Sequence, residues 1–226
     1  MCGISAVFSN DDDIFSELFE SLYHHQHRGQ DSFGFSYFND QGKIETFKKE
    51  GLISNNSSID ISTKIGIGHV RYPTAGKNDL EECQPFYVKG KYHTISMIHN
   101  GQIETNEIKK KIGKLSENCS DSLYLAHYLS YLLNKYEVLN HIRLFYIFSE
   151  IQKIRGAFNC ICLIEGFGLI CFKDKHNIRP LVFGRKRDNY IICSESVGIT
   201  SIDYEVLGDI YGNYVLLFTE NKLDLV

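Results

Sequence analysis

The chain has 226 residues, 43% of them hydrophobic, which is enough for one substantial core. Its net charge of −4 argues against a nucleic-acid partner, because such a partner normally needs a concentrated basic surface. We find neither a basic and apolar leader nor an apolar run near the roughly twenty residues that span a bilayer, so we expect a cytoplasmic protein that binds no membrane. The seven cysteines lack metal-type spacing, which favours reduced thiols.

The first part of the chain predicts strands, one helix and a hairpin. The apolar run GISAVF at 3–8 predicts a buried strand. Apolar residues then recur at helical spacing from Ile14, and we expect Asp12 or Asp13 to cap this helix and histidines to end it. Further strands follow, the first two joined by the turn NDQG, at 33–38, 43–49, 64–72 and 92–101.

The middle of the chain changes to helical spacing, and the last third returns to strands. Helices are predicted at 105–115, 120–136 and 141–154, the second capped by Ser120 and Asp121. Strands are predicted at 157–165, 168–174, 180–186, 189–195 and 213–220. This order, without a linker rich in proline or glycine, predicts one layered α+β domain over 1–226, with its sheets packed between helices.

Polar residues gather where plain strand ends and helix starts would otherwise be predicted. They form the segments HRGQDS at 27–32, GHVRYPTAG at 68–76, IHNGQ at 98–102 and CSDS at 119–122. Each segment taken alone fits an ordinary turn, because glycine, asparagine and aspartate are the usual turn residues.

Together with the opening MCGI, these segments resemble the class II glutamine amidotransferases, whose glutaminase domain is an N-terminal nucleophile hydrolase. The resemblance covers nearly the whole chain, and its motifs occur in the family's order: HRGQD, HVRYPTAG, QPF at 84–86, HNG, SDS, RGAF at 155–158, IRPL at 178–181 and SESV at 194–197. HVRYPTAG and IRPL are most similar to the glutaminase half of amidophosphoribosyltransferases, the enzymes that begin purine synthesis. The resemblance implies a four-layer αββα sandwich with Cys2 at the end of a central strand.

The activity that this resemblance implies is the hydrolysis of L-glutamine to glutamate and ammonia through a γ-glutamyl thioester, without a metal or an organic cofactor. Cys2 would be the nucleophile and its own α-amine the base, because an amine with a pKa of about 7.7 to 8.0 is partly neutral at cell pH. This requires that Met1 be removed. For Cys2 alone, a small apolar residue at a strand start is an equal reading.

The resemblance also assigns the groups that hold the oxyanion. Asn100 and Gly101 match the family's oxyanion hole, in which an amide side chain and a backbone N–H point at the developing charge. Read without the resemblance, the pair is a turn between strands.

Five residues match the positions that hold the amino acid. Arg71 would pair with the α-carboxylate of glutamine, since a guanidinium suits a carboxylate better than lysine does, and Asp121 would accept from the α-ammonium. Gly29 and Thr74 would line the pocket, with Arg28 beside them. Two alternatives stay open: Asp121 as a residue favoured by a helix dipole, and Arg28 as an anchor of its loop.

The chain shows no counterpart of the phosphoribosyltransferase domain into which amidophosphoribosyltransferases continue. We therefore expect either an excised domain or a stand-alone glutaminase that supplies ammonia to a synthase or phosphoribosyltransferase partner. Asn177 stands before IRPL where the family often has glycine, and asparagine tolerates the positive φ of such a turn. Two other functions remain open: a non-catalytic glutamine-binding or regulatory module of the same fold, and a deamidase with another amide substrate.

Overall fold

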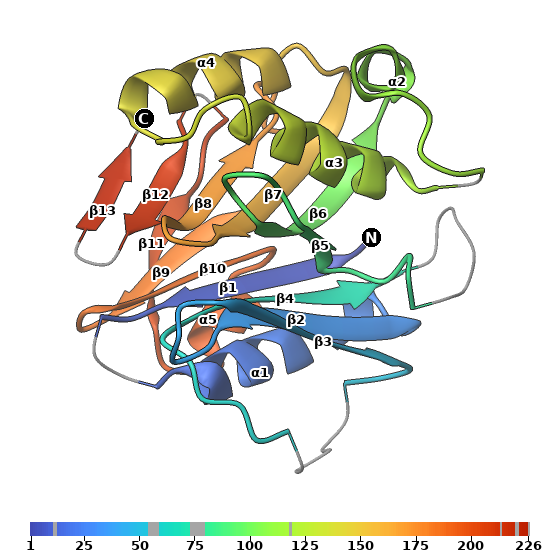
Figure 1. Ribbon diagram of the computed structural model, residues 1–226. Coiled ribbons are helices and arrows are strands. Elements are labelled where there is room, and N and C mark those ends of the chain that lie inside the picture. Colours follow the sequence, from blue (N-terminus) through green and yellow to red (C-terminus); the bar gives the residue numbers. More distant parts are fainter. Residues whose placement is uncertain are drawn as a thin grey trace.

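Two antiparallel sheets lie face to face between two layers of helices, as the computed structural model shows (Figure 1). The structure describes residues 1–10, 13–53, 59–72, 80–117, 119–212, 214–219 and 222–225. Within these residues one sheet has seven strands, in the spatial order β11-β9-β10-β1-β4-β2-β3, and the other has six, in the order β13-β12-β8-β7-β6-β5. The αββα sandwich expected from the sequence is confirmed.

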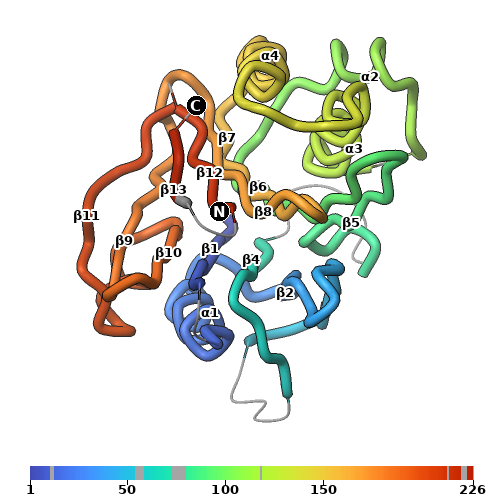
Figure 2. Tube along the Cα trace, turned by 60° about the vertical axis from the view of Figure 1, so that its left-hand side comes forward, coloured from blue at the N-terminus to red at the C-terminus, as the bar shows by residue number. Residues whose placement is uncertain are grey.

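The strands enter the two sheets in consecutive blocks along the chain. The seven-stranded sheet contains β1 (Gly3–Phe8), β2 (Ser32–Phe38), β3 (Ile44–Glu50), β4 (Ile65–Arg71), β9 (Val182–Lys186), β10 (Asn189–Cys193) and β11 (Glu205–Asp209). The six-stranded sheet contains β5 (Phe86–Val88), β6 (Ile95–Ile103), β7 (Gly156–Ile164), β8 (Gly168–Lys173), β12 (Leu216–Thr219) and β13 (Lys222–Leu225). Figure 2 shows β1 in the middle of its sheet, between β10 and β4.

The helices cover the two outer faces. The seven-stranded sheet carries α1 (Phe15–Tyr23) and α5 (Val197–Thr200), and the six-stranded sheet carries α2 (Asn106–Ile112), α3 (Asp121–Leu133) and α4 (His141–Ile151). As predicted, Ser120 caps α3, with its hydroxyl accepting from the Leu123 N–H at 3.3 Å. No helix in the described part of the chain is long and apolar enough to cross a membrane.

The first helix ends at its histidines, as the sequence predicts. It stops at Tyr23, and Gln26–Arg28 form a separate 3₁₀ turn. His24 caps the helix, and the fully buried His25 follows it with its Nδ1 2.7 Å from the Ser21 carbonyl oxygen. The expected cap Asp13 accepts from the Phe15 N–H at 3.2 Å, whereas Asp12 lies outside the described residues.

The layer between the sheets follows from strand alternation, because every second side chain faces the same side. On β1, Ile4, Ala6 and Phe8 face the six-stranded sheet, and Val7 faces α1. One buried cluster lies between the sheets, and one lies under each helical layer. The same alternation decides which side chains at the ends of these strands point into the layer between the sheets.

Candidate functional site

Three strands place polar side chains at one end of the layer between the sheets. Alternation from Ile4 puts Cys2 on the inner face of β1, and Gly3 lies opposite Val70 of β4, so Cys2 is level with Arg71. Ile98 faces the same layer from β6, so Asn100 does too. In both views the N-terminus lies between β4 and β6 (Figures 1 and 2).

Cys2 is held through its backbone rather than its thiol. The Arg28 Nε donates to the Cys2 carbonyl oxygen at 2.9 Å, whereas the Cys2 Sγ lies 3.9 Å from the Tyr72 carbonyl oxygen. Burial raises the pKa of the Cys2 thiol, against the opposing influence of the Tyr72 carbonyl contact and of the positive charges on the Met1 amine, Arg71 and Arg28. A thiol kept protonated in this way needs a base before it can attack a substrate.

Arg28 is fixed by a carboxylate distant in the sequence. Its side chain is 5% exposed and forms an ion pair with Glu195, whose other oxygen accepts from His27 Nε2 at 3.0 Å. The Glu195 N–H donates to His25 Nε2 at 3.1 Å. Burial raises the pKa of Glu195, but Arg28 and His27 outweigh it and hold this pKa below its usual range. SESV is a motif of the sequence, but Glu195 was not predicted as a site residue.

Arg71 is held by Asp31, which the sequence analysis also missed. The Arg71 Nη1 donates to Asp31 Oδ2 at 3.0 Å, and the two side chains are 7% and 20% exposed. The Asp31 N–H donates back to the Arg71 carbonyl oxygen at 3.1 Å. Gly29 packs against the same strand end, since a Cβ there would stand 2.5 Å from the Arg71 carbonyl carbon. The structure thus brings Gly29, Arg28, Arg71 and Cys2 together.

The edge of β6 is open beyond the end of β5, which pairs only with Ile95 to Met97. Two N–H groups on this edge donate to side chains. The His99 N–H donates to Gln84 Oε1 at 2.5 Å, and the Ile103 N–H donates to Asp121 Oδ2 at 2.9 Å. Gln84 also donates to the His99 carbonyl oxygen at 3.1 Å, so it replaces the missing strand at this position.

Gly101 lies between these two capped positions. Its partner on β7, Phe158, makes its backbone hydrogen bonds to Asp174 on the other side. The Gly101 N–H therefore points to the same open edge as the N–H groups of His99 and Ile103. No side chain fits here, because a Cβ would come within 2.0 Å of the Ala157 carbonyl oxygen.

Asn100 supplies a buried donor without an acceptor. The residue is 2% exposed, and its Nδ2 has no hydrogen-bond partner among the described residues. An unmatched buried donor is costly, which is typical of a group kept for a ligand. With the Gly101 N–H on the adjacent edge, the chain offers two donors at successive residues.

Asp121 lies at the start of α3, where the sequence places it. Besides the Ile103 contact, its Oδ1 accepts from the Ser122 N–H at 2.8 Å. The Ser122 Oγ lies 2.7 Å from His99 Nδ1. Burial lowers the pKa of His99 to about 4, with Asp121 opposing and Arg179 adding to the shift, so His99 is neutral near pH 7. The first turn of α3 is thereby tied to β6.

Some expectations concern other parts of the molecule. Thr74 lies outside the described residues.

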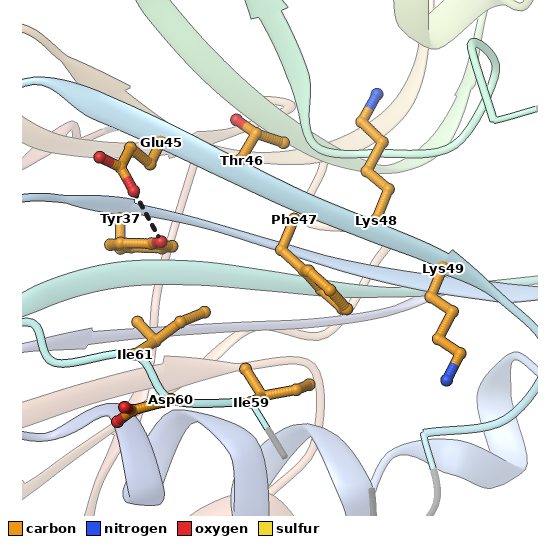
Figure 3. A pocket seen from close by; sticks show the side chains of 9 residues that line it. All are labelled: Tyr37, Glu45, Thr46, Phe47, Lys48, Lys49, Ile59, Asp60 and Ile61. Atoms are coloured by element: carbon orange, nitrogen blue, oxygen red, sulfur yellow. Dashed lines mark hydrogen bonds between the residues drawn. The ribbon is translucent and has the colours of Figure 1, made fainter.

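A cavity of about 660 Å³ opens beside β3 and contains none of the predicted site residues (Figure 3). It is lined by Tyr37, Glu45, Thr46, Phe47, Lys48, Lys49, Ile59, Asp60 and Ile61. In the described ranges no three histidine, cysteine or acidic side chains gather as a metal site would require.

Comparison with known proteins assigns the class. Residues 1–181 match the sequence profile of the class II glutamine amidotransferases. The chain belongs to this family, and its fold is that of the N-terminal nucleophile hydrolases.

The similar proteins are amidophosphoribosyltransferases. That of Pasteurella multocida is 32% identical over 93% of this chain and 44% of its own length, and that of Haemophilus influenzae is 33% identical with the same two coverages. The chain thus spans less than half of these relatives. The structure of glutamine phosphoribosylpyrophosphate amidotransferase from B. subtilis matches all of this chain and 49% of its own, with a TM-score of 0.83 at 22% identity. That likeness shows the shared fold.

Proposed function

We propose that this chain hydrolyses L-glutamine to L-glutamate and ammonia, with Cys2 as the nucleophile. The observation that carries the proposal is the Asn100 Nδ2, which has no partner among the described residues and is buried on the inner face of β6 in the layer that Cys2 enters from β1. Family membership supports the reaction type. The open edge at Gly101 adds the second donor that an oxyanion needs.

In the first half of the reaction the Cys2 thiol gives its proton to its own α-amine, which is free once Met1 is removed. The thiolate attacks the side-chain carbonyl carbon of glutamine, and the oxygen becomes an oxyanion that accepts from Asn100 Nδ2 and the Gly101 N–H. The carbon–nitrogen bond then breaks. The α-ammonium returns its proton to the departing nitrogen, which leaves as ammonia and a γ-glutamyl thioester.

In the second half, water attacks the thioester. The Cys2 amine takes a proton from the water, the oxyanion forms at the same two donors, and the carbon–sulfur bond breaks. The thiolate regains the proton, and glutamate leaves. Because burial raises the pKa of the Cys2 thiol, the thiol needs the amine as a base in the first half.

The remaining residues would hold the amino acid. Arg71, fixed by Asp31, would pair with the α-carboxylate, and Asp121 would accept from the α-ammonium with the lone pairs that its two backbone contacts leave. Gly29 would line the pocket through its backbone, since the missing side chain lets its loop pack against β4, and Arg28 would set the Cys2 backbone. Thr74 would line the pocket, as its motif implies.

We propose further that the ammonia passes to a phosphoribosyltransferase acceptor in purine synthesis. The names of the relatives support this acceptor. We place the reaction in the cytoplasm, which the seven free cysteines favour.

The test measures glutamate release by the full chain whose loss of Met1 is verified by intact mass. We expect release by this chain and loss of release to the detection limit in Cys2→Ala. Cys119→Ala, which removes a half-buried thiol outside the site, should keep the activity. Glutamine binding without release by the Met1-free chain would contradict the proposal and favour a non-catalytic module. Full activity in Cys2→Ala would contradict the mechanism.

A further inference from the structure

The segment that contains IRPL is held against the inner end of the six-stranded sheet by two buried side chains. Asn100, Asn159 and Lys173 lie directly opposite one another on β6, β7 and β8, so all three face the layer between the sheets. Lys173 Nζ donates to the Arg179 carbonyl oxygen at 2.8 Å, and Asn159 Nδ2 donates to the Pro180 carbonyl oxygen at 2.7 Å. Two consecutive carbonyl groups are thereby fixed from inside the molecule.

The turn before this segment is fixed as well. Asn177 has a φ of 57°, and its Oδ1 accepts from the Gly212 N–H at 2.7 Å. The expected positive φ at Asn177 is confirmed. Anchors on both sides leave the backbone at Arg179 with one defined position.

The Arg179 side chain points at the start of the chain. Its Nη1 contacts the Met1 Sδ, and its Nε is buried without a hydrogen-bond partner among the described residues. A thioether is a weak acceptor, so Met1 is a poor match for a guanidinium. Met1 is also the residue whose loss frees the Cys2 amine.

Three guanidinium groups surround the chain start, and two of them are neutralised. Arg28 is paired with Glu195, and Arg71 is paired with Asp31. Arg179 has no carboxylate within ion-pair distance in the described part of the chain. The other titratable and charged groups that face this region, from the elements packed around it, are His69 of β4, His99 of β6, Lys173 of β8 and Asp121 of α3.

We propose that Arg179 is a positioning residue for the base: after Met1 is removed, its uncompensated charge stands beside the Cys2 amine and favours the neutral, proton-accepting form. A like charge nearby disfavours protonation of an amine. Asn159 and Lys173 act through Arg179 by fixing its backbone. The inference rests on the proposed function, in which this amine is the base.

The test measures the pKa of the Cys2 amine directly, without turnover. The Met1-free full chain is acetylated with trace acetic anhydride between pH 5 and pH 9.5, and the N-terminal peptide is quantified by mass spectrometry. Arg179→Met should raise the pKa of the amine by roughly one unit, a common size for the influence of one nearby charge, and Arg179→Lys should leave it near the wild-type value. Arg185→Met, which removes a half-exposed arginine of β9, is the matched control and should not change it.

Arg179→Gln provides a second uncharged variant should Arg179→Met fail to fold, and it should raise the same pKa. An amine that titrates alike in wild type and a folded uncharged variant would overturn the proposal. So would an uncharged variant that changes only the KM for glutamine, because this result would assign Arg179 to substrate binding.

The pH profile of glutamate release gives the second readout and separates the two proposals. Its acidic limb should move to higher pH in Arg179→Met and stay in place in Arg179→Lys. If the pKa of the amine shifts in the variant but the chains release no glutamate, the proposed function alone is contradicted. If the chains release glutamate but the pKa of the amine does not shift in the variant, the role of Arg179 alone is contradicted.

Discussion

The cysteine at position 2 is placed by its carbonyl group, and among the described residues its sulfur has a single long hydrogen-bond contact. Arg28 holds that carbonyl, and Glu195 holds Arg28, so the ion pair acts on the backbone of Cys2 rather than on its thiol. This arrangement suits a nucleophile whose sulfur must move toward a carbonyl carbon and back. The positions of Arg28 and Arg71 are therefore set by the carboxylates of Glu195 and Asp31.

Asp31 provides a test at this scale. In Asp31→Asn the guanidinium of Arg71 loses its charged partner, so the fork proposed to receive the glutamine carboxylate is less well fixed. We expect the KM for glutamine to rise roughly tenfold, which corresponds to about 1.4 kcal/mol, with a smaller change in kcat. Steady-state kinetics of the Met1-free chain measure both values.

Asp40→Asn is the matched control, because Asp40 lies exposed in the turn between β2 and β3. It should leave both constants unchanged. An unaltered KM in Asp31→Asn would show that Arg71 does not need this partner, and the proposed carboxylate site would lose its main support.

At the scale of elements, the site depends on where β5 ends. This strand covers β6 only at Ile95 to Met97. On the free edge that follows, Gln84 and Asp121 accept from the N–H groups of His99 and Ile103, and the Gly101 N–H between them stays open for the proposed oxyanion. A longer β5 would occupy the Gly101 N–H in a strand ladder. The short strand and the glycine are therefore two parts of one feature.

Sequence periodicity predicts the long elements and misses the short ones. The helices α3 and α4 and the inner strands have enough apolar repeats to show their period. β5 has three residues, and β11 is exposed along its whole length, so neither carries an alternating pattern. The 3₁₀ turn at Gln26–Arg28 was also not predicted, because three residues are too few to show a period.

The same limit applies to the site. Motifs and their resemblance to a family identify Cys2, Arg71 and Asn100 as candidates, because each stands in a short segment of distinctive composition. The partners of these residues are set by packing: Glu195 lies 167 positions from Arg28, and a local pattern carries no information about such a pair. Only the fold brings the two together.

At the scale of the whole molecule, three buried histidines link stability to pH. Burial is the main cause in each case, and it lowers the pKa from 6.5 to about 4 for His25, about 3 for His69 and about 4 for His99. Above pH 7 these side chains are neutral in the folded and unfolded states alike. As the pH falls below 6.5, the unfolded chain binds protons that the folded chain does not, so the free energy of unfolding decreases.

We therefore expect this free energy to be nearly constant from pH 8 to pH 7 and to fall between pH 6.5 and pH 5. The slope approaches about 1.4 kcal/mol per pH unit for each histidine. Urea unfolding at a series of pH values measures it, and the window lies above the range in which most carboxylates titrate. Equal stability at pH 7.5 and pH 5 would contradict the neutral, buried state of these rings.

The central claim is that Cys2 attacks glutamine only when its own amine is free. The most direct measurement is covalent labelling with a glutamine analogue that carries a diazoketone in place of the side-chain amide, followed by intact-mass and peptide mass spectrometry. The account predicts one adduct on Cys2 of the Met1-free chain, prevented by excess L-glutamine and absent from the chain that retains Met1. Labelling of a different cysteine, or equal labelling with and without Met1, would contradict it.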